Sequence, residues 1–143
     1  MAFIYFDSSH AIEVHDSIII KSGGLLGILN IGLLESTLEH IQNDLYYPHI
    51  ENKVTHIFHS INKNHSFQDG NKRASIALSA YFLEINGYDY RVSIFIERME
   101  NIAVYVADNK IDKHLLFEIV QSIIYEEDYN EELKLKIVQA LIK

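Results

Sequence analysis

Residues 74–85 form a stretch that is predicted to be a helix with almost no polar face, and this stretch limits what the chain can fold into. A helix that is apolar on all sides belongs in the middle of a domain, because no side of it is suited to water. The Asn86-Gly87 pair that follows is typical of a left-handed helix exit. The sequence therefore predicts a fold built around one buried central helix.

Apolar positions in the rest of the chain also recur mostly at helical spacing. This spacing predicts further helices over residues 10–21, 32–41, 52–62, 94–108, 112–123 and 131–142. Ser8 or Ser9 could cap the first of them, residues 3–6 suit an extended lead-in, and residues 88–92 suit a brief strand. We expect one all-α domain over residues 1–143, a compact bundle of about six or seven helices.

Composition excludes several classes of protein. The chain has 143 residues, is 48% hydrophobic and has no cysteine, so a disulfide framework, a thiolate nucleophile and a cysteine zinc site are impossible. A formal net charge of −8 argues against nucleic-acid binding and suits either a basic protein partner or simple solubility. Met1 to Phe6 lacks a basic leader region, and the run from Leu25 to Leu34 is too short to span a membrane. We expect a soluble, cytoplasmic protein with no membrane partner.

A polar cluster directly precedes the central helix and has the sequence His65-Ser66-Phe67-Gln68-Asp69-Gly70-Asn71-Lys72-Arg73. Asp69 is a suitable N-cap, and Gly70 permits a tight turn into the helix. The first turn of a helix leaves backbone N–H groups unpaired, and the helix dipole makes that end positive. A phosphate group would therefore fit at this helix start.

The side chains of the cluster suit the same chemistry. Lys72 and Arg73 add two cations, and Arg73 can hold phosphate oxygens in a bidentate fork. Asp69 is a hard oxygen ligand of the kind that Mg²⁺ uses together with substrate phosphates. His65 can accept a proton near neutral pH. These residues predict a magnesium–nucleotide site beside a general base; the alternative is an ordinary helix start with solvated cations.

This stretch resembles the motif of the Fic/Doc family, His-x-Phe-x-(Asp/Glu)-(Gly/Ala)-Asn-(Gly/Lys)-Arg. The lysine before the arginine is similar to the death-on-curing (Doc) branch, and so are residues 32–36 and 61–65. Ser66 stands where many members have proline, and Ala74 where Doc-like members often have threonine. Neither departure removes a charged or proton-transferring group.

The resemblance implies a Fic fold with a small flap, and a transfer from Mg-ATP to a protein hydroxyl. In that scheme His65 takes the hydroxyl proton, Asp69 holds Mg²⁺, and the transferring group is stabilised by Gly70, Asn71, Lys72 and Arg73. Phe67 anchors the loop in the core. Most AMP-transferring members have glycine at the position of Lys72, so the lysine favours a kinase that acts on a threonine of elongation factor Tu. The alternatives are AMP transfer and a non-catalytic binding module.

Doc-like members are toxins of toxin–antitoxin modules, so the resemblance also implies a separate Phd-like antitoxin. Some Fic proteins instead carry an inhibitory helix with the pattern (Ser/Thr)-x-x-x-Glu-(Gly/Asn). Residues 122–127 and 9–14 match this pattern only in part, and we predict no internal inhibitor.

Two other features were assigned from the sequence. Residues 43–50 lie, by resemblance, near the family's flap, which docks an extended target peptide by strand addition; a plain loop with two buried tyrosines, Tyr46 and Tyr47, is the alternative. His10 and His15 have no evident chemical partner in the sequence, which favours surface or capping roles.

Overall fold

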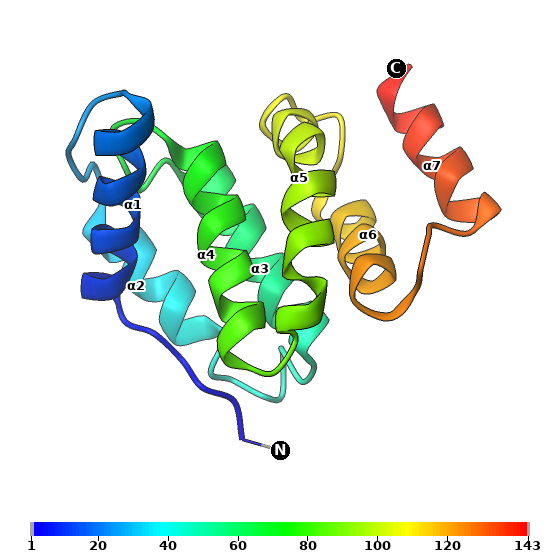
Figure 1. The fold of residues 1–143 in the computed structure, drawn as a ribbon, viewed down its shortest axis with the longest axis horizontal. Helices are drawn as coiled ribbons and strands as arrows, with labels where there is room; N and C mark the ends of the chain where they lie inside the picture. Colours follow the sequence, from blue (N-terminus) through cyan, green and yellow to red (C-terminus); the bar gives the residue numbers. More distant parts are fainter. Residues whose placement is uncertain (1, 143) are drawn as a thin grey trace.

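The computed structural model describes residues 2–142, and within this range the chain folds into seven α-helices and one short 3-10 helix, with no named β-strand (Figure 1). The elements in chain order are α1 (Ser8–Ser22), α2 (Ile31–His40), α3 (Ile50–Asn64), α4 (Asn71–Ile85), η1 (Asp89–Arg91), α5 (Val92–Ala107), α6 (Lys113–Tyr125) and α7 (Glu131–Leu141). The prediction of an all-α bundle of six or seven helices is confirmed.

Helices α3 and α4 form the centre of the bundle. They pack side by side; α2, α5 and α6 also contact α3, whereas α1 and α5 contact α4 (Figure 1). The prediction of a buried α4 is confirmed in part: Leu78, Phe82 and Leu83 are fully enclosed, whereas other apolar side chains such as Ile76 and Ile85 are only partly buried. The core of the domain therefore lies around the helix that follows the polar cluster.

Helix α3 is more buried than its sequence suggests. Eleven of its 15 residues are buried, against seven of 15 in α4. Several of these are polar and have partners inside the protein: Lys53 donates to the Ile41 carbonyl at 2.5 Å, and Asn62 donates to the Ala103 carbonyl at 3.0 Å. Burial of a polar group is tolerated when a hydrogen bond replaces its water.

Short polar side chains cap four of the helices. At α1 the cap is Asp7, which accepts from the His10 N–H at 3.0 Å, so the prediction of Ser8 or Ser9 as the cap is wrong. Asn30, Asp112 and Asn130 cap α2, α6 and α7 in the same way. These caps satisfy backbone donors that the first helical turn leaves unpaired.

The predicted strand at residues 88–92 is wrong. This segment forms η1 and runs directly into α5. Arg91 donates to the Ile123 carbonyl at 2.7 Å and to the Glu126 carbonyl at 2.6 Å, which fastens the segment to the end of α6. β-Branched and aromatic residues form a strand only where a partner strand is available, and none lies here among the described residues.

None of the helices in residues 2–142 combines the length and the apolar character that crossing a bilayer requires.

Candidate active site

The polar cluster forms a tight loop that joins the carboxyl end of α3 to the amino end of α4. His65 is the C-cap of α3, has left-handed backbone angles (φ 50°, ψ 50°), and is exposed. Ser66 and Phe67 turn inward and are buried. The loop therefore presents His65 to solvent and is anchored in the core by the two residues that follow it.

Asn71 holds the loop closed. Its Oδ1 accepts from the Phe67 N–H at 3.2 Å, and its Nδ2 donates to the Phe67 carbonyl at 2.9 Å. Phe67 itself is fully buried, as expected of the loop's anchor. The side chain of Asn71 is therefore committed to the loop, so its backbone N–H is the group that remains for an anion.

Gly70, not Asp69, is the N-cap of α4, so that part of the sequence assignment is wrong. Gly70 has φ 76° and ψ 22°, and a Cβ there would lie 2.9 Å from Ile19 Cδ1. Both the left-handed backbone and the lack of space require glycine. The first helical hydrogen bond runs from Ala74 N to Gly70 O, so the N–H groups of residues 71–73 have no helical acceptor. The helix start therefore has the unpaired backbone donors that the sequence predicts, and such donors suit an anion.

The carboxylate of Asp69 is held by two backbone N–H groups. Oδ2 accepts from Leu25 at 3.1 Å, and Oδ1 accepts from Gly70 at 2.8 Å. These two hydrogen bonds, with a smaller contribution from the charge of Arg73, lower the pKa of Asp69. The carboxylate is consequently ionised at neutral pH. Each oxygen accepts one N–H and keeps a further lone pair, so the group fits a Mg²⁺ ligand.

Arg73 is tied to the carboxyl end of α1. Its Nη1 donates to Ser22 Oγ at 2.5 Å and to the Gly23 carbonyl at 2.9 Å. A Cβ on Gly24 would lie 2.7 Å from Asp69 Oδ2 and 3.1 Å from Arg73 Nη2. The backbone after α1 thus passes close to both charged groups. Lys72 is exposed beside them.

An extended segment, residues 27–30, pairs with the loop. Gln68 N donates to Gly27 O at 3.0 Å, Leu29 N donates to Ser66 O at 2.8 Å, and Ile28 forms an antiparallel bridge with Phe67. In Figure 1 this segment and the loop lie together at the top of the bundle.

The flap assignment for residues 43–50 is therefore wrong. These residues form turns before α3, at the opposite end of that helix from His65 (Figure 1). A helix of 15 residues is about 22 Å long, so they cannot line the loop. The alternative of two buried tyrosines holds only in part: Tyr46 is 72% exposed, whereas Tyr47 is partly buried and packs on His56 with ring centroids 4.6 Å apart.

His15 is a site residue that the sequence reasoning missed. It is fully buried, its Nε2 lies 2.6 Å from the Asp69 carbonyl oxygen, and its ring stacks on Phe67. The surface or capping role expected for it is wrong. Its spacing from Ala11 and Ile19, at i−4 and i+4, was the available signal, because those two apolar residues mark the buried face of α1.

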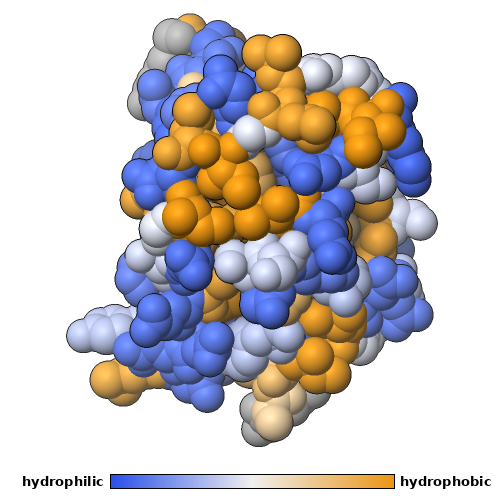
Figure 2. All heavy atoms as spheres, turned by 90° about the vertical axis from the view of Figure 1, so that its left-hand side faces the viewer, coloured by the Kyte–Doolittle hydropathy of each residue, from blue (hydrophilic) through white to orange (hydrophobic). Residues whose placement is uncertain are grey.

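Apolar side chains are exposed around the extended segment. They gather on the upper part of the face that Figure 2 shows and include Ile20, Leu25, Leu26, Ile28, Leu29 and Ile31. Leu26 and Leu29 are 57% and 60% exposed. An apolar patch of this kind on a protein surface is typical of a contact site for another protein.

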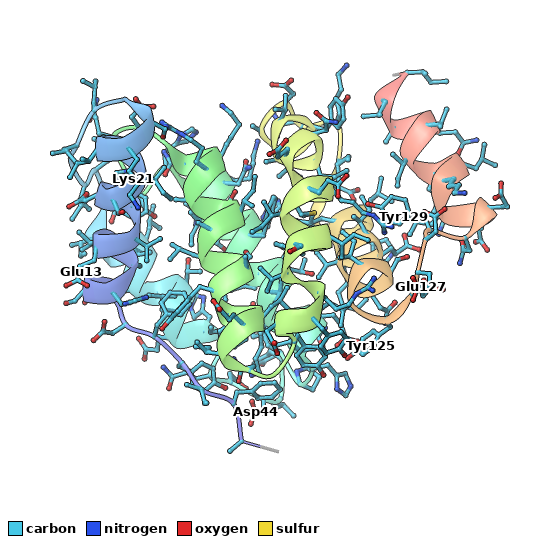
Figure 3. The ribbon with its side chains drawn as sticks, in the orientation of Figure 1. Glu13, Lys21, Asp44, Tyr125, Glu127 and Tyr129 are labelled. Carbon is cyan, nitrogen blue, oxygen red and sulfur yellow. The ribbon has the colours of Figure 1, made fainter. Side chains whose placement is uncertain are left out.

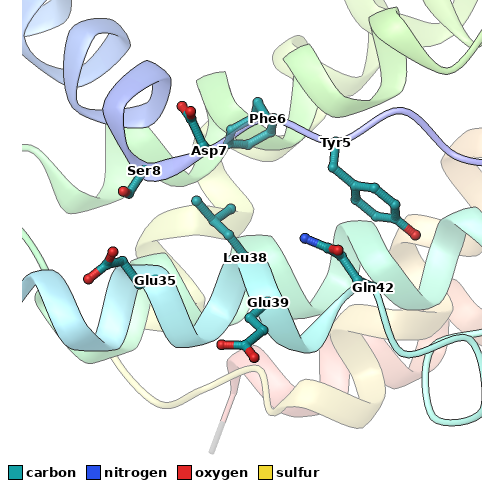
Figure 4. A pocket seen from close by; sticks show the side chains of 8 residues that line it. All are labelled: Tyr5, Phe6, Asp7, Ser8, Glu35, Leu38, Glu39 and Gln42. Atoms are coloured by element: carbon teal, nitrogen blue, oxygen red, sulfur yellow. The ribbon is translucent and has the colours of Figure 1, made fainter.

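A separate groove of about 470 Å³ lies between the N-terminal segment and α2 (Figure 4). Three carboxylates line it, those of Asp7, Glu35 and Glu39. Like charges would repel a nucleotide triphosphate. The groove is therefore poorly suited to a nucleotide triphosphate.

The segments that partly match the inhibitory pattern lie away from Arg73. Figure 3 shows Glu13 on the outer side of α1, and Glu127 beyond α6 on the other side of the molecule. The carbonyls of Glu126 and Glu127 accept hydrogen bonds from Arg91 and Arg98. Within residues 2–142, no carboxylate forms a salt bridge with Arg73.

The helical bundle, the loop and the helix start define this chain as a member of the Fic/DOC family, whose sequence model matches residues 5–83. That match covers α1 to α3, all but the last two residues of α4 and the whole candidate site, and it is more than half of the chain. Among individual proteins, the chain is similar to the "Toxin Doc" of Mycolicibacterium smegmatis. The two are 32% identical over 97 residues, and the match covers 65% of this chain and 75% of the relative.

Proposed function

We propose that this protein is the toxin of a toxin–antitoxin module and transfers the γ-phosphoryl group of Mg-ATP to a threonine hydroxyl of a protein target. The observation that carries the proposal is the arrangement of the loop: an exposed imidazole stands at one end, and a helix start with three free backbone N–H groups stands at the other. Similarity to a protein named Toxin Doc supports the toxin assignment.

Each residue of the motif has a role in the proposed transfer. His65 accepts the proton of the target hydroxyl, whose oxygen then forms a bond to the γ-phosphorus while the bond to the ADP oxygen breaks. Asp69 and the nucleotide phosphates would hold Mg²⁺, which when bound supplies charge neutralisation on the phosphate oxygens. Gly70 allows close backbone approach, and the N–H groups of residues 71–73 with Lys72 and Arg73 stabilise the transferring group.

Lys72 favours phosphoryl over AMP transfer. Glycine at this position leaves room for the backbone to close on the α- and β-phosphates, as AMP transfer requires in the members that the motif resembles. A lysine fills that space and adds a cation, so the nucleotide would bind reversed. The Doc-like members with lysine are kinases by resemblance, which makes elongation factor Tu in the cytoplasm the first target to test.

The extended segment before α2 is the proposed docking edge for the target. Gly27 O and Leu29 N point to the loop, so the N–H and C=O of Ile28 point the other way, as strand alternation requires. An extended target segment could pair with this edge beside His65. Replacing the exposed Leu26 and Leu29 by serine should raise the KM for the protein target and leave ATP affinity unchanged. Leu135→Ser, on the exposed side of α7, is the control.

The deciding experiment uses ATP labelled at the α- or the γ-phosphate with purified elongation factor Tu. Label from the γ position alone supports the kinase, label from the α position establishes AMP transfer, and label from neither supports a non-catalytic binding module. His65→Ala should abolish transfer and preserve the fold, because His65 is exposed. Undiminished transfer by this variant would overturn the proposed mechanism.

Control by an external partner follows from the same proposal. No internal carboxylate within residues 2–142 pairs with Arg73, so a separate Phd-like antitoxin is the expected inhibitor. Co-expression of the neighbouring reading frame should relieve growth arrest by the wild-type chain, whereas the His65→Ala variant should cause no arrest.

A further inference from the structure

His15 is the buried histidine of α1, and it reaches the motif from outside it. The side chain has no exposed surface and lies between Ala11 and Ile19 on the buried face of the helix. Its Nε2 is 2.6 Å from the carbonyl oxygen of Asp69, across 54 residues of sequence. A polar ring nitrogen that is buried away from water needs a hydrogen-bond partner in the protein, and for Nε2 that partner is the Asp69 carbonyl.

The direction of this hydrogen bond is set by chemistry. A carbonyl oxygen can only accept, so Nε2 carries the proton and donates it to Asp69. The other ring nitrogen, Nδ1, lies 3.1 Å from Asp16 Oδ1; a carboxylate oxygen can only accept, so this contact is a hydrogen bond only when Nδ1 is protonated as well. The ring is also stacked on Phe67, with centroids 3.9 Å apart and planes at 5°. The Nε2 hydrogen bond and the stacking on Phe67 therefore fix the imidazole in position.

Both polar groups of the peptide bond between Asp69 and Gly70 therefore form hydrogen bonds. Its oxygen accepts from His15, and its N–H donates to Oδ1 of the Asp69 side chain at 2.8 Å. The second carboxylate oxygen is fixed by the Leu25 N–H. The orientation of the Asp69 carboxylate thus depends on the orientation of this peptide bond, and His15 is the side chain that fixes it.

We propose that His15 is a positioning residue for Asp69, acting through the peptide bond that precedes α4. A carboxylate that is to bind Mg²⁺ must be held in one orientation, and the groups that hold such ligands contribute strongly to metal affinity. A Cβ on Gly70 would meet His15 Nε2 at an ordinary contact distance of 3.5 Å but would crowd Ile19 Cδ1 at 2.9 Å, so glycine leaves room for this face of α1 against the loop. The effect on Mg²⁺ rests on the proposed function, whereas the hydrogen bond does not.

Two variants of His15 separate positioning from packing. His15→Phe keeps a flat ring on Phe67 but cannot donate, whereas the side-chain amide of His15→Gln can donate from a position close to that of Nε2. His10→Phe is the matched control, since His10 lies on the same helix and packs on Tyr81. In His15→Phe, the Mg²⁺ concentration for half-maximal transfer should rise about 10–100-fold. In His15→Gln and His10→Phe it should stay close to that of the wild type.

Two measurements on the protein without nucleotide complete the test. In the ¹⁵N spectrum of the wild type, Nε2 of His15 should be protonated and its proton should exchange slowly. The Gly70 amide should exchange about tenfold faster or more in His15→Phe than in the wild type and His15→Gln.

An unprotonated Nε2, or Gly70 exchange equal in all variants, overturns the inference even if no transfer is found. A wild type that transfers no label overturns the proposed function alone. Equal loss of transfer in both His15 variants, with equal loss of thermal stability, would reduce His15 to a packing residue.

Discussion

Asn71 and Phe67 are joined by two hydrogen bonds that run in opposite directions between one side chain and one backbone residue. The pair closes the loop at the point where it enters α4, and it explains why an asparagine stands at the first position of the helix. A carboxamide has both a donor and an acceptor, which a carboxylate or a hydroxyl could not arrange in this geometry.

Asn71→Ala should therefore impair the loop more than its exposure suggests. The variant leaves the Phe67 N–H and carbonyl unsatisfied, which should lower the free energy of unfolding by about 1–3 kcal/mol. A shift of the loop by about 1 Å should reduce transfer on the order of 100-fold. Urea denaturation and the labelled-ATP assay measure the two effects. Gln68→Ala, in the same loop but with an exposed side chain, should change neither.

Gly70→Ala should be destabilising for two separable reasons. The left-handed backbone costs an L-residue about 1–2 kcal/mol, and the new methyl group would meet Ile19 Cδ1 at 2.9 Å. Gly87→Ala isolates the first cost, because Gly87 has φ 87° and nothing within 4 Å of the added Cβ. Thermal denaturation should show a larger loss for Gly70→Ala. Adding Ile19→Val, which removes Cδ1, should recover part of the difference; equal losses at both glycines would contradict this account.

Arg73→Lys should show that the guanidinium fork, and not only its charge, is needed. A lysine keeps one positive charge but cannot reach Ser22 Oγ and the Gly23 carbonyl while also facing a phosphate. We expect transfer to fall on the order of 100–1,000-fold in single-turnover assays. Ser22→Ala, which leaves the Gly23 carbonyl as acceptor, should have a much smaller effect. Full activity of Arg73→Lys would show that charge alone suffices.

Lys72→Gly should alter which phosphorus is attacked. The side chain is exposed, so its removal should cost only the helix penalty of glycine, about 1 kcal/mol. If the lysine sets the direction of the nucleotide, label from the α-phosphate should appear on the target and label from the γ-phosphate should decrease. Lys72→Ala removes the charge without adding backbone freedom and serves as the comparison. An unchanged preference in both variants would mean that other residues orient the nucleotide.

His56 should make the fold sensitive to acid. Burial is the main cause that lowers the pKa of His56 from 6.5 to about 4, and the nearby Lys113 amine adds to it. His40 and His59 act in the same direction. The folded state therefore favours neutral His56. Below pH 6.5 His56 becomes protonated in the unfolded chain, whereas in the folded chain it stays neutral until about pH 4. The free energy of unfolding therefore falls as the pH is lowered through this range.

The loss should amount to about 2 kcal/mol once solvent screening is allowed for. Urea denaturation of the wild type at pH 7.5 and pH 4.5 measures the difference, and His56→Phe should reduce it. The same pH dependence in the variant would place the titrating group elsewhere.

The sequence alone determined the α-helices and which functional groups the loop carries. Apolar spacing located six helices and the buried α4, because a helix must present one face to the core whatever its neighbours are. The motif named His65, Asp69 and Arg73, because a proton acceptor, a carboxylate and a guanidinium near a helix start suit phosphate chemistry in any fold.

Only the tertiary structure decided which segments meet. It brought residues 27–30, and not 43–50, beside the loop, and it brought His15 under Asp69 from 54 residues away. It also buried more of α3 than of α4, because partners such as the Ile41 carbonyl replaced the water around Lys53. Local periodicity indicates which face of an element is buried. Contacts between distant segments depend instead on how the elements pack against one another, and periodicity does not predict that packing.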